Sequence, residues 1–248
     1  MINREIKRVH SLEKIKYRQR YQQYFIEGKR LVQTAIEMQA GLESIYVTNS
    51  FLKDNSDFAD KLFACGVEMT CIPSKVMKKL SFTESPSGIA AICQLPKPNP
   101  PDESIPKWVF FDKISDPGNM GTLIRSAGYF GFNHIALSPD CVDPFNPKVV
   151  RAGMGAHFGL SIYTNVFLSQ FTVSHTLIGA DQSGKSSDQF SVPKNYVLVF
   201  GNEARGLSDE SRNLLHEVVT INKPGFGESL NVSVAGSILM YKFSMKES

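Results

Sequence analysis

The segment LPKPNPPDESIP, residues 95–106, constrains the fold of this chain more than any other feature of its sequence. Five of its twelve positions are proline, and proline lacks the N–H group that a helix interior or a central strand requires. Such a segment favours an extended, semi-rigid linker. It therefore predicts a first domain over residues 1–94, a linker over 95–106 and a second domain over 107–248, both domains being of ordinary size.

The first predicted domain alternates helix-like and strand-like segments. Apolar residues recur at helical spacing over residues 25–39 and 56–65, whereas residues 44–48, 67–72 and 89–94 are short apolar runs typical of strands. This alternation predicts a small α/β domain.

The first 30 residues are strongly basic. They hold nine lysines and arginines against three glutamates, in a chain whose formal net charge is only +3. A basic segment can follow the phosphates of a nucleic acid, but it can equally be a solvated helix face. Both interpretations stay open at the level of sequence. The N-terminus lacks the apolar core of a secretory signal, and no apolar run approaches the roughly 18 residues of a membrane span, so a cytoplasmic protein is expected.

The second predicted domain alternates strands and helices more plainly. A mostly parallel sheet covered by helices on both faces is expected, because short apolar strands are separated by helical segments. Ligands of such sheets bind beyond the carboxyl ends of the strands. The predicted strands are residues 108–112, 134–138, 161–163, 176–180, 196–200 and 217–220, and the predicted helices are residues 121–130, 147–156, 208–215 and 231–243.

One nucleotide-binding motif is present by pattern alone. Residues 179–186, GADQSGKS, fit the phosphate-loop pattern GxxxxGK[ST]. That mechanism requires a helix directly after the loop, since the phosphates rest on its N-terminus. Residues 187–192 carry no helical apolar stripe and Pro193 follows, so the segment is predicted to be a polar turn.

The first polar cluster at a strand end lies within residues 110–132. A turn rich in proline and glycine follows the strand, and Asn119 stands where a helix N-cap is expected. Arg125 lies among Leu123, Ile124 and Ala127 in the sequence, and an arginine in apolar company is usually paired or bound to an anion.

Two further clusters follow later strands. Residues 196–210 place Gly201, Asn202 and Glu203 directly after an apolar strand, and residues 220–243 place Ser229 and Asn231 before a helix rich in small residues. Small residues allow that helix to pack closely against another backbone.

Together the clusters resemble the three signature motifs of the SpoU (TrmH-type) branch of the SPOUT RNA methyltransferases. The stretches DPGNMGTLIRSAGYFG, LVFGNEARGLSDE and SLNVSVA have the order and spacing of that family, and the match covers residues 107–243. The stretch RQRYQQYFIEGKRLVQTAIE is similar to the small ribosomal-protein-like RNA-binding domain that many members carry.

The resemblance implies an S-adenosylmethionine-dependent enzyme that methylates ribose 2'-hydroxyls of structured RNA, without a metal. It also implies a trefoil knot in the second domain and a homodimer with active sites near the subunit interface. Positions that match the cofactor-binding residues of the family are Phe200, Gly201, Ile221, Leu230 and Asn231, and positions that match its polar catalytic residues are Asn119, Arg125, Glu203, Ser229 and Asn231.

Arg125 has two possible roles under this resemblance. The family mechanism uses it as the base that removes the hydroxyl proton, although guanidinium normally stays protonated. Alternatively it binds the adjacent RNA phosphate and orients the hydroxyl. Asn119 and Glu203 would orient Arg125 or its partner, and Ser229 and Asn231 would order the third motif.

One position departs from the family pattern, and one rival function remains. Members usually have Ile-Pro-Met where this chain has Ile221-Asn222-Lys223, which bears on the contacts to the cofactor. The rival is a non-catalytic RNA-binding or ribosome-assembly factor that keeps the fold. By analogy with members that carry this N-terminal domain, ribosomal RNA is expected as substrate over transfer RNA.

Overall fold

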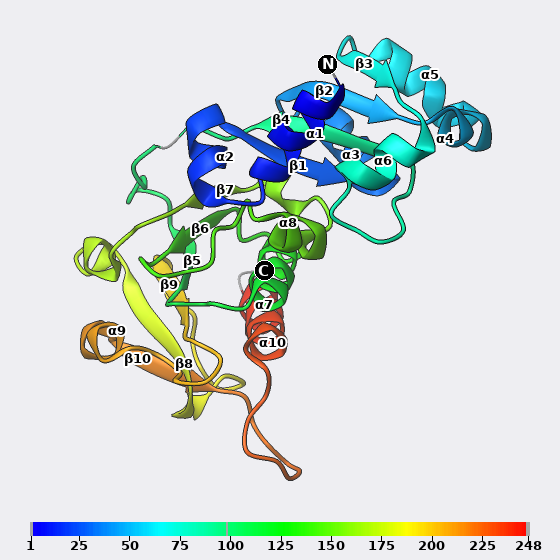
Figure 1. The fold of residues 1–248 in the computed structure, drawn as a ribbon. Coiled ribbons are helices and arrows are strands. Elements are labelled where there is room, and N and C mark those ends of the chain that lie inside the picture. The colour runs from blue at the N-terminus through cyan, green and yellow to red at the C-terminus, as the bar shows by residue number, and fades with distance from the viewer. Residues whose placement is uncertain (1, 98, 247–248) are drawn as a thin grey trace. The chain divides into compact units, whose positions relative to one another are not determined.

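The computed structural model describes residues 2–97 and 99–246; Met1, Glu247 and Ser248 of the predicted domains and Pro98 of the predicted linker lie outside the described residues. The chain forms two compact units (Figure 1). The first comprises Met1–Lys97 and Phe145–Phe158, and the second Pro98–Pro144 and Gly159–Ser248. Residues 145–158 thus pack with the first unit, although the linker-based division puts them in the second domain. Phe145 and Val150 enter the hydrophobic core of the first unit.

The first unit is a four-stranded sheet between two layers of helices. Its strand order is β1-β4-β2-β3, with β4 antiparallel to both neighbours and β2 parallel to β3. Apolar side chains of α3, α4 and α5 cover one face and those of α1 and α6 the other, as the α/β pattern predicts. The strands are β1 (Gln23–Glu27), β2 (Leu42–Val47), β3 (Glu68–Cys71) and β4 (Ile89–Gln94), and the helices are α1 (Ile2–Ser11), α2 (Ile15–Tyr21), α3 (Lys29–Glu37), α4 (Asn49–Asp54), α5 (Ser56–Ala64) and α6 (Ser74–Leu80).

The predicted helix over residues 25–39 is wrong in its first part, which is strand β1. Phe25 enters the core on one face of the sheet, whereas Tyr24 and Ile26 enter the core on the other. This alternation is the period of a strand. Gly28 then has φ +104°, a value that disfavours any other residue, and helix α3 starts after it.

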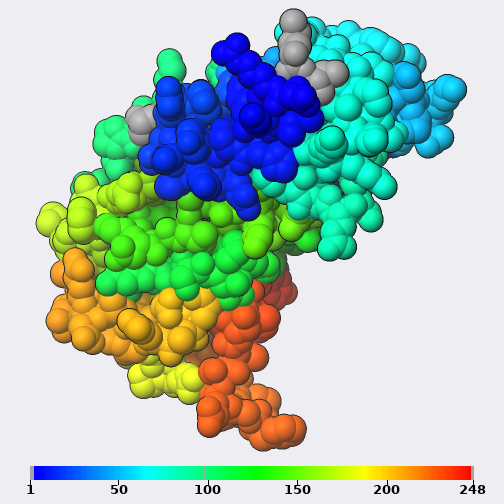
Figure 2. Space-filling view, in the orientation of Figure 1, coloured from blue at the N-terminus to red at the C-terminus, as the bar shows by residue number. Residues whose placement is uncertain are grey.

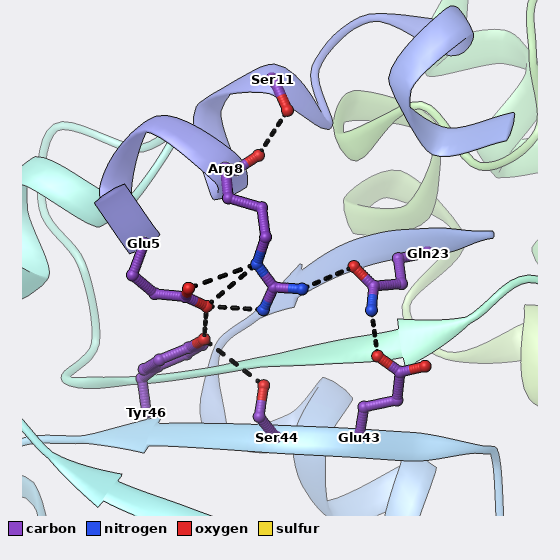
Figure 3. Close-up of polar contacts among 7 residues, drawn as sticks. All are labelled: Glu5, Arg8, Ser11, Gln23, Glu43, Ser44 and Tyr46. Atoms are coloured by element: carbon purple, nitrogen blue, oxygen red, sulfur yellow. Dashed lines mark hydrogen bonds and ion pairs between the residues drawn. The ribbon is translucent and has the colours of Figure 1, made fainter. Parts of the chain in front are cut away.

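Polar contacts fasten α1 to this sheet (Figure 3). The Arg8 guanidinium binds Glu5 on the same helix, with Nη2 2.6 Å from Oε1, and donates to Gln23 Oε1 of β1 at 2.8 Å. The Tyr46 hydroxyl of β2 donates to Glu5, and Gln23 donates to Glu43. A charged pair therefore links the helix to two strands.

The second unit confirms the expected parallel sheet. Its strand order is β10-β8-β9-β5-β6-β7, and every neighbouring pair is parallel. All five residues of β9 are buried, as in a strand covered on both faces. The strands are β5 (Lys107–Phe111), β6 (His134–Leu137), β7 (Ser161–Tyr163), β8 (Thr176–Ser186), β9 (Tyr196–Phe200) and β10 (Glu217–Thr220).

Two long helices of this unit, α7 (Pro117–Tyr129) and α10 (Val232–Met245), pack side by side (Figure 1). A Cβ atom added at Gly236 of α10 would lie 2.4 Å from Leu123 Cδ2 of α7, so the close approach requires glycine there. Shorter helices are α8 (Pro147–Gly153), which belongs to the first unit, and α9 (Asp209–Leu214), with 3-10 turns at Ala156–Gly159 and Leu168–Phe171. No helix in the described part of the chain has the length and apolarity to cross a lipid bilayer.

The phosphate-loop pattern lies within strand β8 and is not the turn predicted for it. Gly179 pairs with Val218 and Lys185 with Val219, so residues 180–184 bulge out of an otherwise continuous ladder. Lys185 Nζ lies 2.7 Å from Glu217 Oε2. Since no helix follows, the segment lacks the N–H groups that would hold phosphates.

Candidate functional site

A cleft of about 610 Å³ opens at the carboxyl ends of β8, β9 and β10. This is the edge at which ligands of parallel sheets bind, and the volume is that of a small-molecule site. Its walls are residues 200–204 and Gly206 at the end of β9, residues 219–230 from the end of β10 onwards, and three apolar side chains of α10, with Ala180, Asp181 and Gln182 of the bulge in β8.

Gly201 shapes the floor of this cleft because no side chain fits there. A Cβ atom at this position would lie 2.3 Å from both the carbonyl carbon of Gly206 and the amide nitrogen of Leu207. The loop folds back onto Gly201 through paired backbone hydrogen bonds between Asn202 and Gly206. The close approach leaves backbone groups, in place of side chains, facing the cleft.

The Glu203 carboxylate is the point at which the loop after β9 meets the start of α7. Its oxygens accept hydrogen bonds from the backbone nitrogens of Ser115 and Asp116 at 3.5 and 3.1 Å and from the Ser115 hydroxyl at 3.3 Å. The side-chain amides of Asn119 and Asn202 donate at 3.2 and 3.1 Å. A carboxylate strengthens each of these bonds.

A chain of amide hydrogen bonds continues from Glu203 to the third cluster. Asn119 donates to Glu203 and its Oδ1 accepts from Asn231 Nδ2 at 2.9 Å. Asn231 Oδ1 then caps α10, accepting from the backbone nitrogen of Ser233 at 2.9 Å and its hydroxyl at 2.6 Å. The three polar clusters, distant in sequence, are therefore joined by a single relay.

The expectation that Asn119 caps a helix is wrong, because α7 begins earlier. Asp116 is the N-cap, its Oδ1 accepting from the Asn119 backbone nitrogen at 2.8 Å, and Pro117 occupies the first turn. Proline suits that position because its fixed φ matches the helix and its N–H group is not needed. The side chain of Asn119 is thus released for the relay.

Arg125 is exposed, although its neighbours in the sequence are apolar. Leu123, Ile124 and Ala127 are fully buried beneath α7, whereas Arg125 points from the opposite face. Among the described residues it has no hydrogen-bond or ion-pair partner, so all its donors are free. It stands six residues beyond Asn119, about 9 Å along the helix axis.

The loop between β10 and α10 is exposed over residues 222–231 and, in orange, projects beyond both elements (Figure 1). Asn222, which replaces the proline of the family pattern, donates to Asp188 Oδ2 at 2.9 Å. Lys223, which replaces the methionine, donates through Nζ to the Gly227 carbonyl at 2.8 Å. The side chain of Phe226 in this loop is fully exposed. The two replacements therefore fold and anchor the loop.

The structure brings most of the sequence-predicted residues to one place. Asn119 and Asn231 are linked by hydrogen bonds to Glu203, which lines the cleft, whereas Arg125 does not line it. Phe200 lies in the cleft wall with its side chain buried in the core. The predicted residues that line the cleft are Phe200, Gly201, Glu203, Ile221, Ser229 and Leu230.

Sequence reasoning missed Asp112, which supports the site from below. Its side chain is 2% exposed, and Oδ2 accepts from the Ser208 backbone nitrogen, the N-cap of α9, at 2.7 Å. Its own backbone nitrogen donates to the Phe200 carbonyl at 2.8 Å. The sequence itself shows only an aspartate directly after an apolar strand-like run.

Burial and hydrogen bonding act in opposite directions on the pKa of Glu203. Partial burial raises the pKa, but hydrogen bonds from its own backbone, Asn119, Asp116 and Ser115 together lower it below the ordinary value. The ionised carboxylate therefore stabilises the site above the ordinary pKa, and that contribution is lost as the pH falls through the lowered value.

Family models match both parts of the chain. The model of the SpoU rRNA Methylase family matches residues 106–241, and the MRM3-like substrate binding domain matches residues 3–91. The fold is that of a SPOUT-type α/β protein. The chain belongs to the SpoU rRNA methylase family.

Relatives and solved structures extend over nearly the whole chain. The 23S rRNA (guanosine(2553)-2'-O)-methyltransferase RlmP of Bacillus subtilis is 27% identical over 244 residues, 96% of this chain and 95% of the relative. The AdoMet-bound rRNA methyltransferase from Sinorhizobium meliloti is 25% identical with a TM-score of 0.81, covering 97% and 94% of the two chains. The SpoU methyltransferase AviRb from Streptomyces viridochromogenes, solved with AdoMet, is 23% identical with a TM-score of 0.86, covering 98% and 97%, and supports the fold.

Replacing Asn119 by alanine should raise the pKa of Glu203 towards its ordinary value, because a donor that favours the ionised carboxylate is lost. The shift is measured by following the Glu203 carboxyl carbon in an NMR titration. Asn222→Ala is the matched control, since it removes an amide–carboxylate bond elsewhere in the same unit. An unchanged Glu203 pKa in Asn119→Ala would contradict the relay.

Proposed function

We propose that this chain transfers a methyl group from S-adenosylmethionine to a ribose 2'-hydroxyl of structured RNA, with ribosomal RNA as the substrate class, in the cytoplasm. The observation that carries the proposal is the relay from Glu203 through Asn119 to Asn231, which joins the three family motifs beside the cleft. The names of the relatives support the same reaction: RlmP is a 2'-O-methyltransferase of 23S rRNA.

The residues around the cleft fit S-adenosylmethionine. Its volume of about 610 Å³ suffices for a ligand of that size, and at Gly201 the backbone comes within reach because no Cβ intervenes. Phe200 would contribute backbone groups, since its side chain is in the core. Ile221 and Leu230, on the opposite wall, would enclose the cofactor, which supplies a sulfonium-activated methyl group when bound.

The polar residues would orient the reaction. The amide relay fixes Asn231, and with it the turn that holds Ser229 at the cleft. A sulfonium methyl group needs in-line placement of the hydroxyl, and positioning of this kind can contribute several kcal/mol. Asn222 and Lys223 would preserve cofactor binding by keeping the loop folded through their own hydrogen bonds.

Arg125 would bind the RNA phosphate next to the target ribose. Its guanidinium is exposed and unpaired among the described residues, and five N–H donors in a fork suit a phosphate. The base role remains the alternative for this residue. In either role the side chain acts on RNA and not on the cofactor.

The trefoil knot belongs to the proposal. Strand β10 lies at the sheet edge beside β8, whereas α10, which follows it, packs on α7 and against Phe200 of β9. The connection, residues 221–231, would have to cross back over the strand ends, as a knotted chain does.

A homodimer would bury the outer face of α7 and α10. The apolar side chains on that face are Tyr129, 84% exposed, with Val234, Tyr241 and Met245, each about half exposed. Phe130 links the two helices, its ring centroid 5.7 Å from that of Tyr241. Exposed apolar patches of this kind mark protein interfaces. Arg125 lies one turn from Tyr129 on the same side of α7, so a second copy would stand close to the site.

Calorimetric titration tests the cofactor. The purified chain should bind S-adenosylmethionine and should not bind ATP, because residues 179–186 form a strand and not a phosphate loop. Gly201→Ala should abolish the binding, while Gly225→Ala, where a Cβ atom meets nothing within 4 Å, should retain it. Folded protein that binds no S-adenosylmethionine, even with ribosomal RNA added, would instead support the non-catalytic RNA-binding factor.

Arg125→Ala should lower methyl transfer to RNA about 100-fold or more, since misplacement of a reacting group costs this much, with S-adenosylmethionine binding unchanged. Arg125→Lys should keep part of the activity with a raised KM for RNA if the residue binds phosphate by charge. The measurement is transfer of the labelled methyl group to ribosomal RNA. Wild-type turnover in Arg125→Ala would refute both roles.

Tyr241→Glu should convert the dimer into a folded monomer, because it introduces a charge into the centre of an apolar interface. Sedimentation equilibrium measures the change. Phe226→Glu is the control, as it introduces the same charge at an exposed aromatic residue outside the face. A monomeric wild-type chain at micromolar concentration, or a dimeric Tyr241→Glu variant, is the result that would reject the interface.

A further inference from the structure

Helix α2 (Ile15–Tyr21) buries an arginine where a surface helix normally buries apolar residues. Arg18 is the only buried residue of α2, at 2% exposure. Ile15 is 50% and Tyr21 39% exposed. A helix of a globular protein is ordinarily held by an apolar stripe on the core. The outer face of α2 is thus presented to solvent with apolar and aromatic groups uncovered.

Polar contacts hold α2 in place. Arg18 Nη1 donates to the carbonyls of Leu12 and Glu13, just after α1, at 2.6 and 2.8 Å. Carbonyls at a helix end have no partner within the helix, so the guanidinium satisfies them. Helix α1 is in turn bound to the sheet through Glu5 and Arg8 (Figure 3). The helix is therefore fixed without using its outer face.

That outer face is cationic and has no counter-charge. Residues 14–26 contain four lysines and arginines and no acidic residue. Lys14, Lys16 and Arg20 are exposed, and none of them pairs with a carboxylate in the described part of the chain. Figure 2 shows the segment of the first two helices, in blue, at the molecular surface on the side turned to the viewer. Unpaired cations in such a row suit a polyanion.

Two tyrosines lie among these cations. The rings of Tyr17 and Tyr21 are stacked, with centroids 6.2 Å apart and planes inclined by 16°. Lys16 Nζ lies 4.9 Å from the Tyr17 centroid, and Arg20 Cζ lies 5.8 Å from that of Tyr21. Aromatic rings interleaved with cations bind single-stranded nucleic acids, because bases stack on rings while phosphates meet the charges.

We propose that the α2 face, formed by Lys14, Lys16, Tyr17, Arg20 and Tyr21, binds unpaired nucleotides of the substrate RNA. The inference rests on the proposed function, and it specifies which nucleotides of the RNA the first unit recognises. Unpaired nucleotides fit better than duplex, since bases must be free to stack. A helix of seven residues, about 10 Å long, in which Ile15 is the one aliphatic residue, is a poor membrane anchor.

The experiment measures binding of fluorescein-labelled oligouridylate of about 12 nucleotides by the full chain across a series of salt concentrations. Tyr17→Leu/Tyr21→Leu removes both rings and should weaken binding about tenfold or more with the salt dependence unchanged. Lys14→Ala/Lys16→Ala/Arg20→Ala should reduce the slope of log K against log salt by about 2, for three lost phosphate contacts.

Matched controls change the same groups elsewhere in the first unit. Lys53→Ala/Lys61→Ala/Lys75→Ala removes three exposed lysines from α4, α5 and α6, and Phe63→Leu removes a 65% exposed ring from α5. Both should bind the oligonucleotide like the wild type. A duplex of the same length should bind more weakly and should not respond to the tyrosine substitutions.

Three results would overturn the proposal. The first is a tyrosine variant that binds oligouridylate as tightly as Phe63→Leu, and the second is a charge variant with the salt slope of its lysine control. The third is wild-type protein that binds phosphatidylserine vesicles and not the oligonucleotide.

Calorimetry with S-adenosylmethionine on the same variants separates failure of the α2 face from failure of the proposed function. Variants that keep cofactor binding and lose oligonucleotide binding support the α2 face, whereas a wild type that binds RNA without binding cofactor rejects the methyltransferase and leaves the face standing.

Discussion

The carboxylate of Glu203 holds the second unit's site together, because five donors from two segments converge on it. Its bonds to Ser115 and Asp116 tie the loop after β9 to the start of α7. Its bond to Asn119 sets the orientation of that amide, and only then can Asn119 Oδ1 accept from Asn231. Removing the charge would loosen each bond in turn, since hydrogen bonds to ionised groups are about twice as strong as neutral ones.

The relay works only because backbones can approach closely around it. Gly201 lets the loop of residues 202–206 fold onto itself, and Gly236 lets α10 pack against α7. The second contact places the N-terminus of α10, with its Asn231 cap, beside Asn119. The tight packing and the amide relay therefore depend on each other. Without the packing, the Asn119 and Asn231 amides would be too far apart to bond. Arg125, on the exposed outer side of α7, takes no part in this arrangement and can contact a large substrate.

The sequence predicted the parallel sheet and the ligand-binding edge because buried strands between helices leave a strong pattern. It failed where local pattern was ambiguous. Residues 24–26 have the apolar content of either a helix or a strand, and only burial on both faces of a sheet decides for β1. Residues 179–186 match a functional motif by letters, but pairing with β10 makes them a strand. Arg125 has apolar neighbours in the sequence, yet the turn of the helix places it on the opposite, exposed face.

The residues that sequence reasoning could not interpret are those whose partners lie far along the chain. In the sequence Asp112 is only the end of a strand. Its hydrogen bond with the backbone of Ser208, which supports α9, is seen only in the structure. The basic N-terminus had two equal interpretations because charge alone cannot distinguish a solvated helix face from a binding surface. The buried Arg18 supports the proposed binding surface. A solvated face needs no buried guanidinium beneath it, whereas a recognition surface must be held rigidly while its apolar and cationic groups stay uncovered. Polar anchoring of α2 meets both requirements at once, in the same way that the amide relay positions the catalytic cleft without filling it.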